Sequence, residues 1–171
     1  LAANQFKVYY QPIVDLITGR VNKVEALIRW QHPEFGLINP DRFIPLTEET
    51  GLIVAIGDWV FKESARQLKY WKALYNPKLQ MSVNMSPVQF RNTDNLCKTW
   101  FVYLQELALP GQSMVIEITE GLLLEAESGV TDKLLGFRDA GVQVAIDDFV
   151  TGYSSLSYLK KFDIDYLKID Q

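Results

Sequence analysis

The chain has 171 residues, of which 48% are hydrophobic and 22% are charged. This composition allows a buried core and predicts a globular protein. Its net charge of −4 argues against non-specific binding to nucleic acid, and we expect no DNA or RNA partner. One cysteine and one histidine exclude an internal disulfide and nearly exclude a zinc site of the usual nitrogen and sulfur type. No apolar run reaches the roughly 18 residues of a membrane span, which predicts a cytoplasmic protein or the cytoplasmic part of a membrane-tethered one.

The first part of the chain predicts a hairpin followed by two helices. Strands over Lys7–Val14 and Asn22–Trp30 flank a turn at Asp15–Gly19. A short helix starts at Asn39, with asparagine as cap and proline in the first turn, and ends near residue 51. A long amphipathic helix follows over Ile53–Leu74.

The rest of the chain alternates strand and helix. Crossovers of this length favour parallel pairing, and hence an α/β sheet or barrel. A closed (β/α)8 barrel needs about 250 residues. We therefore expect residues 1–171 to be roughly the N-terminal two thirds of a barrel domain, with the C-terminal part absent. The predicted strands are Leu79–Asn84, Ser113–Thr119, Val142–Asp148 and Asp165–Asp170, and the predicted helices are Asp94–Leu109, Gly129–Ala140 and Ser154–Lys161.

Five predicted strands place a polar side chain on the face opposite their apolar residues. An antiparallel sheet with one solvated face would explain this alternation equally well on single strands. The helical crossovers favour a parallel sheet covered on both faces, where unpaired carboxylates are costly, so one shared pocket at the carboxyl ends of the strands is the better interpretation. Carboxylate and amide oxygens select hard cations such as Mg²⁺ or Mn²⁺. The five residues are Glu25, Asn84, Glu117, Asp147 and Lys168.

Asp147 and Asp148 are adjacent, and neighbouring side chains of a strand point to opposite faces. Both reach one site only if the strand ends or bends there, and 149–152 is a plausible place for the bend. The pair could then bridge two metal ions, an arrangement used in phosphodiester hydrolysis. Taken alone, an Asp-Asp pair at a strand end is more often a turn or a helix cap.

The ordered motifs of the chain resemble the EAL family of cyclic di-GMP phosphodiesterases. The resemblance rests on Glu25-Ala26-Leu27 together with landmarks that follow one another across essentially the whole sequence. That order is much more specific than the three letters alone. The landmarks are residues 10–14 (YQPIV), 25–30 (EALIRW), 32–36 (HPEFG), 43–45 (FIP), 82–86 (SVNMS), 117–120 (EITE), 147–149 (DDF), 151–156 (TGYSSL) and 168–170 (KID).

The resemblance implies a modified, TIM-like (β/α)8 barrel that hydrolyses cyclic di-GMP to linear pGpG with Mg²⁺ or Mn²⁺. It also implies a homodimer and an upstream sensory or GGDEF-type domain. Catalytic roles are implied for Glu25, Asp147 and Lys168, of which the lysine lies near the attacking water, and a loop-anchoring role for Glu120. The implied metal ligands are Glu25, Asn84, Glu117, Asp147 and, for the second metal, Asp148; the implied substrate-binding residues are Gln11, Leu27 and Arg29.

Two departures from the family pattern keep a second hypothesis open. Val150 stands where the family has glycine, and a β-branched residue there would be strained if the position requires a positive φ. The family's later catalytic glutamate would lie beyond Gln171, so we expect the segment alone not to be competent. The alternative function is a weak or inactive domain that acts as a cyclic di-GMP receptor.

Overall fold

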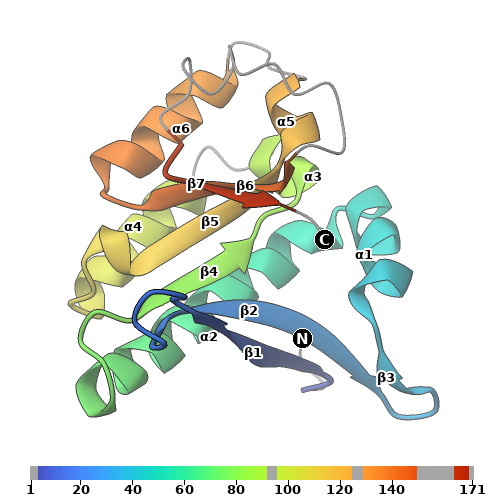
Figure 1. Ribbon diagram of the computed structural model, residues 1–171. Helices are drawn as coiled ribbons and strands as arrows, with labels where there is room; N and C mark the ends of the chain where they lie inside the picture. The colour runs from blue at the N-terminus through green and yellow to red at the C-terminus, as the bar shows by residue number, and fades with distance from the viewer. Residues whose placement is uncertain (1–3, 92–95, 125–128, 150–163, 170–171) are drawn as a thin grey trace.

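A computed structural model of the chain describes residues 4–91, 96–124, 129–149 and 164–169. The described strands form one seven-stranded sheet in the order β1-β2-β4-β5-β6-β7, with β3 paired to β2 (Figure 1). The strands are β1 (Phe6–Val14), β2 (Val21–His32), β3 (Gly36–Ile38), β4 (Gln80–Asn84), β5 (Met114–Thr119), β6 (Gln143–Phe149) and β7 (Tyr166–Ile169).

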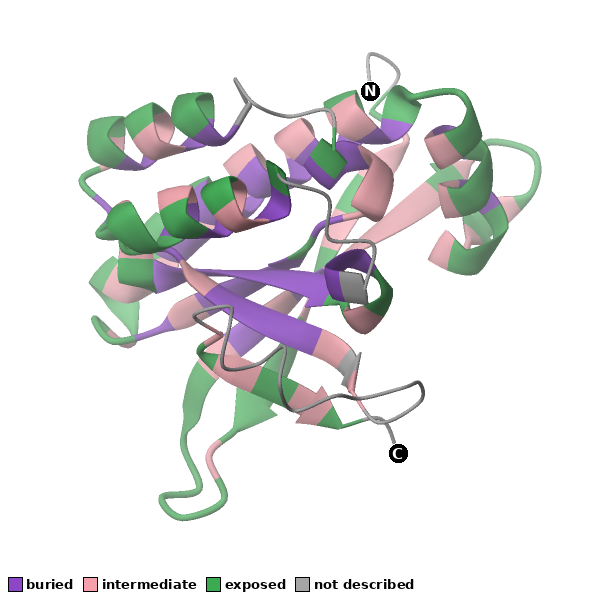
Figure 2. Cartoon of the chain, turned by 90° about the horizontal axis from the view of Figure 1, so that it is seen from above, coloured by how far each residue is buried: buried purple, intermediate pink, exposed green. Residues whose placement is uncertain are grey.

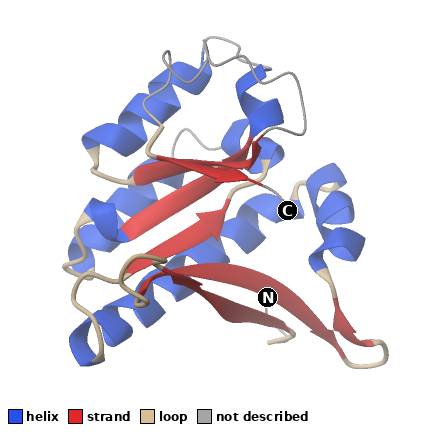
Figure 3. Ribbon diagram, viewed as in Figure 1, coloured by secondary structure: helices blue, strands red, loops and turns tan. Residues whose placement is uncertain are grey.

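Helices connect β3 to β4, β4 to β5 and β5 to β6 (Figure 3). In the described part of the chain, no helix is both long and apolar enough to cross a membrane. The α-helices are α1 (Pro40–Glu49), α2 (Leu52–Leu74), α3 (Pro87–Arg91), α4 (Leu96–Glu106), α5 (Glu120–Leu124) and α6 (Gly129–Asp139), with a 3-10 turn at Gly111–Ser113.

The predicted pairing of the strands is confirmed. Strands β1 and β2 form an antiparallel hairpin, whereas β2, β4, β5, β6 and β7 pair in parallel in that order. Among the described strands, β1 and β7 form the two edges of the sheet. This mostly parallel arrangement agrees with the α/β sheet or barrel that the strand and helix alternation predicts.

The apolar face of the sheet packs against helices and forms the core. Figure 1 shows α2, α4 and α6 on this side, and Figure 2 shows that burial is concentrated in the central strands and in the helix faces turned toward them. The alternating residues Met81 and Val83 of β4 and Ile116 and Ile118 of β5 are all buried. The opposite face of the central strands therefore remains for polar side chains.

Three short elements, β3, α3 and α5, were not predicted, because three to five residues carry too little periodicity to be recognised. The predicted helix over 154–161 lies outside the described residues. Asn39 takes the N-cap position of α1 and Pro40 opens the helix, as predicted, but the Asn39 side chain makes no capping hydrogen bond to the described chain.

The predicted helix over Asp94–Leu109 extends too far, because α4 ends at Glu106. Ala108 adopts a φ of 55°, and the Leu109 N–H donates to the Leu104 carbonyl at 2.9 Å. This is a Schellman-type helix end, which usually has glycine in the left-handed position, as α6 does at Gly141. Alanine in that position does not mark the left-handed turn, and the nearest stop signal in the sequence is Pro110.

Gly57 of α2 lies directly against the amide of Gln89, and we predict that Gly57→Ala destabilises the fold. An added Cβ would lie 2.3 Å from both Nε2 and Oε1 of Gln89, a side chain that is itself 1% exposed. Overpacking of this kind costs about 1–3 kcal/mol. Urea unfolding of the wild type and of Gly57→Ala should show the lower free energy of unfolding of the variant.

Gly136 of α6 provides the matched control, since an added Cβ there meets nothing within 4 Å. Gly136→Ala should stabilise the protein by up to about 1 kcal/mol because alanine is the better helix former. If Gly57→Ala gains stability to the same extent, the close contact with Gln89 is unimportant.

Tyr10 of β1 packs edge-on against Trp71 of α2, with ring centroids 4.9 Å apart. Burial, followed by the negative charge of Glu63, raises the pKa of Tyr10 to about 12. The folded state therefore holds this proton to higher pH than the unfolded state, and stability is lost as pH rises above 10.

We predict that the stability of the wild type relative to Tyr10→Phe falls by about 1 kcal/mol between pH 9 and pH 11, a figure reduced for the partial exposure of the ring. Urea titrations at both pH values would measure it. A difference that stays constant with pH would show that the phenol titrates alike in both states.

Candidate metal and phosphodiester site

The five polar side chains predicted to share a pocket lie together at the carboxyl ends of the parallel strands. The Lys168 ammonium donates to Glu117 Oε2 at 2.6 Å, to Asp147 Oδ2 at 2.9 Å and to Glu25 Oε2 at 3.3 Å. The Asn84 amide donates to Glu25 Oε1 at 2.9 Å. We call Glu25, Asn84, Glu117, Asp147 and Lys168 the acidic cluster.

Strand register explains this convergence. Asn84 is the last residue of β4 and pairs with Glu117 of β5, and Asp147 of β6 pairs with Thr119, two residues further along β5. Because side chains two apart share a face, all of these groups point to the same side of the sheet. The parallel pairing excludes the alternative of an antiparallel sheet with a solvated face.

The donor set suits a hard divalent cation. One oxygen from each of Glu25, Glu117 and Asp147 lies within 4.8 Å of the other two. Neither thiolate nor imidazole takes part in this group. Carboxylate and amide oxygens prefer Mg²⁺ or Mn²⁺, so the residues present fit the metal that the sequence predicts.

Burial and hydrogen bonding together set the pKa values of Glu117 and Lys168. Glu117 is 2% exposed, and this desolvation raises the pKa of its carboxyl group despite the hydrogen bond from Lys168. Burial alone would lower the pKa of Lys168, but its hydrogen bonds to Glu117 and Asp147 outweigh that effect and raise it. The ammonium is therefore charged throughout the physiological range.

The pairing of β6 with β7 is irregular around Asp148, whereas the predicted bend at 149–152 lies almost entirely outside the described residues. Ile146 pairs with Leu167 and Phe149 with Ile169, so two residues of β6 stand opposite one residue of β7. An extra residue of this kind is a β-bulge, which bends a strand and re-aims its side chains. The Asp148 side chain and Val150 lie outside the described part of the structure, so their predicted roles stay predictions.

The predicted substrate-binding residues lie on the hairpin, with Gln11 beside the cluster and Leu27 and Arg29 further along β2. Gln11 pairs with Glu25 across β1 and β2 and is exposed, and Leu27 is half-buried. Arg29 lies further along β2, where its guanidinium donates to the Ile28 carbonyl at 2.8 Å. Arg29 therefore lies four residues beyond Glu25 on β2, at the second position along the same face of the strand. Glu120, the predicted loop anchor, is the first residue of α5.

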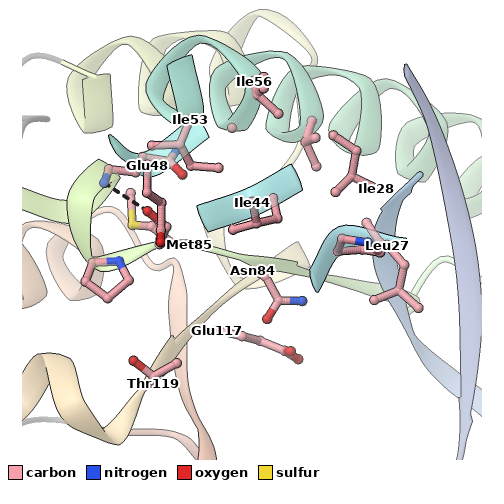
Figure 4. A pocket seen from close by; sticks show the side chains of 17 residues that line it. Leu27, Ile28, Ile44, Glu48, Ile53, Ile56, Asn84, Met85, Glu117 and Thr119 are labelled. Atoms are coloured by element: carbon pink, nitrogen blue, oxygen red, sulfur yellow. Dashed lines mark hydrogen bonds between the residues drawn. The ribbon is translucent and has the colours of Figure 1, made fainter. Parts of the chain in front are cut away.

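A mostly apolar cavity of about 280 Å³ opens beside the cluster and shares Asn84 and Glu117 with it (Figure 4). Sequence reasoning missed this cavity, although the spacing of Ile44 and Glu48 on α1 places both on one helix face. Gln89, also in the lining, has an Nε2 with no hydrogen-bond partner among the described residues.

A second polar layer, also not predicted, lies on the same face toward the amino ends of the strands. Gln80 Nε2 donates to Gln143 Oε1 at 2.5 Å, and the Tyr166 hydroxyl contacts the same oxygen at 3.2 Å. The Lys23 ammonium lies 3.2 Å from the centroid of the Tyr166 ring.

Comparisons with known proteins agree with this geometry. The family model of the EAL domain matches residues 1–171. The chain is 40% identical to the cyclic di-GMP phosphodiesterase PdeR of Escherichia coli, with all of this chain and 25% of PdeR covered. It is 39% identical to the bifunctional diguanylate cyclase/cyclic di-GMP phosphodiesterase MucR of Pseudomonas aeruginosa, again with all of this chain and 25% of that protein covered.

A solved structure, described as the PaMucR phosphodiesterase in complex with c-di-GMP, superposes with a TM-score of 0.92 at 39% identity, covering 99% of this chain and 68% of that one. The chain therefore spans about a quarter of the length of these two curated relatives and two thirds of this solved chain.

Proposed function

This chain belongs to the EAL domain family, and on that basis we propose that it is a metal-dependent phosphodiesterase that hydrolyses cyclic di-GMP to linear pGpG in bacterial signalling. The observation that carries the proposal is the convergence of Glu25, Glu117 and Asp147 within 4.8 Å of one another. Relatives that carry the phosphodiesterase name support the choice of substrate.

The metal would be held by Glu25, Asn84, Glu117 and Asp147, with Asp148 as a ligand of a second ion. Bound Mg²⁺ or Mn²⁺ supplies a water of lowered pKa and offsets the charge that gathers on the phosphate oxygens. Lys168, charged and in reach of three carboxylates, adds a hydrogen-bond donor close to the same point.

The remaining residues would orient the dinucleotide. The planar guanidinium of Arg29 suits a phosphate or a guanine edge. Leu27 lies between Arg29 and Glu25 on β2, and Gln11 lies beside Glu25 on β1, so both could contact the dinucleotide near the cluster. The cavity beside Asn84 is smaller than the sites of about 300–1,000 Å³ that hold drug-sized ligands, so it would accept a part of the substrate and not the whole. Hydrolysis then breaks one ester bond: the water oxygen joins the phosphorus and a proton passes to the departing sugar oxygen.

Assembly is a further part of the proposal. The family resemblance supports a homodimer and an attached domain upstream, and MucR, which is named as a bifunctional cyclase and phosphodiesterase, supports a GGDEF-type neighbour. Glu120 would anchor the loop that follows β6.

The decisive experiment is turnover of cyclic di-GMP by the complete protein with Mg²⁺ or Mn²⁺, with linear product separated by chromatography. Glu25→Ala should abolish turnover, whereas Glu34→Ala, which removes an exposed carboxylate just beyond β2, should retain it. Equal turnover by the Glu25 variant would remove the assignment. Binding of cyclic di-GMP without turnover in the metal-replete wild type would instead support the receptor.

A further inference from the structure

The Lys168 ammonium and a divalent cation draw on the same oxygens. Nζ contacts Oε2 of Glu25, Oε2 of Glu117 and Oδ2 of Asp147 at 2.6–3.3 Å, and these three carboxylates form the group whose spacing suits a metal. We propose that Lys168 is a positioning residue, a tethered cation that holds the three carboxylates in a ligand arrangement and competes with the metal for them. The inference rests on the metal site of the proposed function.

Like charges explain why such a cation is needed. Three carboxylates this close repel one another, and one of them would otherwise take up a proton or turn away. Glu117 cannot turn to solvent, because it is almost fully buried. Lys168 belongs to β7, which pairs with β6, the strand of Asp147. The pairing of these strands therefore places the positive charge of Lys168 beside the carboxylates.

The net negative charge of the group favours binding of a divalent metal, but the ammonium of Lys168 opposes that binding. The three carboxylates and the ammonium together carry two negative charges, which one divalent cation neutralises. Two cations that share ligands in a partly buried site repel each other strongly. Metal binding therefore requires the ammonium to give up at least one of its carboxylates, which lowers the affinity for the metal.

Lys23 is the matched control on the same face of the sheet. It is half-buried like Lys168, but it lies over the ring of Tyr166 in the layer below the cluster. Lys23→Met thus removes a positive charge from the same face without removing the contacts to the three carboxylates.

The experiment titrates the complete protein with Mn²⁺ alone, by calorimetry and by electron paramagnetic resonance, and records thermal unfolding in EDTA. Lys168→Met is expected to bind Mn²⁺ at least about tenfold more tightly than the wild type, and to unfold at a lower temperature in EDTA because Glu117 loses its cation. Lys168→Arg should restore both values, and Lys23→Met should change Mn²⁺ affinity by less than about threefold. Lys168→Gln replaces the methionine variant if that protein does not fold.

Turnover of cyclic di-GMP by the wild type, measured alongside, separates the two hypotheses. With turnover present, Mn²⁺ affinity that is unchanged or weaker in Lys168→Met overturns the competition while the proposed function stands. A wild type that binds no Mn²⁺ overturns the metal site and with it both proposals.

Discussion

Glu117→Gln in the complete protein is expected to lower turnover of cyclic di-GMP by about a thousandfold, since a neutral amide oxygen binds a divalent cation much more weakly than a charged carboxylate. The fold should nevertheless keep or gain stability. Burial raises the pKa of Glu117, so the ionised side chain is costly in the folded state and a neutral amide avoids that cost. Steady-state kinetics and thermal unfolding of the same preparation would give both results.

The stability gain should depend on pH in a defined direction. A carboxyl group whose pKa is raised on folding costs stability only above its ordinary value of 4.5, so the advantage of Glu117→Gln should grow as pH rises from there. Glu106→Gln, an exposed glutamate of α4, is the control and should change neither quantity. Retained turnover in Glu117→Gln would show that this carboxylate is not a ligand.

Trp100→Ala is expected to destabilise the fold by about 4 kcal/mol, the range of large-to-small changes at buried tryptophan. Trp100 of α4 is 1% exposed and stacks on Phe61 of α2, with ring centroids 4.0 Å apart and planes 2° from parallel. Its indole N–H donates to Asp58 Oδ1 at 3.1 Å. Trp100 therefore stabilises the packing of α4 against α2, two of the helices that cover the apolar face of the sheet.

A conservative series separates packing from hydrogen bonding. Trp100→Phe keeps a ring against Phe61 but loses the indole donor, so it should cost less than the alanine change and leave Asp58 to its ion pair with Lys62 at 2.8 Å. Urea unfolding of both variants measures the difference. Equal costs would mean that the stacked ring contributes little.

Much of the cluster could be predicted because its signal is local. A carboxylate among apolar residues of a strand violates the usual pattern, and Glu25, Glu117 and Asp147 each do so. Strand order then follows from the helical crossovers, which bring the carboxyl ends of the strands to one edge. The structure confirms that the five polar groups lie together, while their roles in catalysis stay predictions.

What could not be predicted depends on contacts between segments far apart in the sequence. The cavity beside Asn84 is lined by β2, β4, β5, α1, α2 and α3, and its volume follows from how these pack. The close approach of Gly57 to Gln89 is likewise visible only in three dimensions. The end of α4 at Glu106 escaped prediction for a different reason, since the left-handed residue after it, Ala108, is not the glycine that usually marks such a turn.

The two edge strands have a practical consequence for protein production. Leu167 and Ile169 of β7 are exposed, and β7 and β1 each have a backbone edge that is unpaired among the described strands. Such edges are templates for self-association into extended aggregates. Residues 1–171 expressed by themselves should therefore precipitate or form mixed oligomers, and light scattering should precede any assay of that fragment.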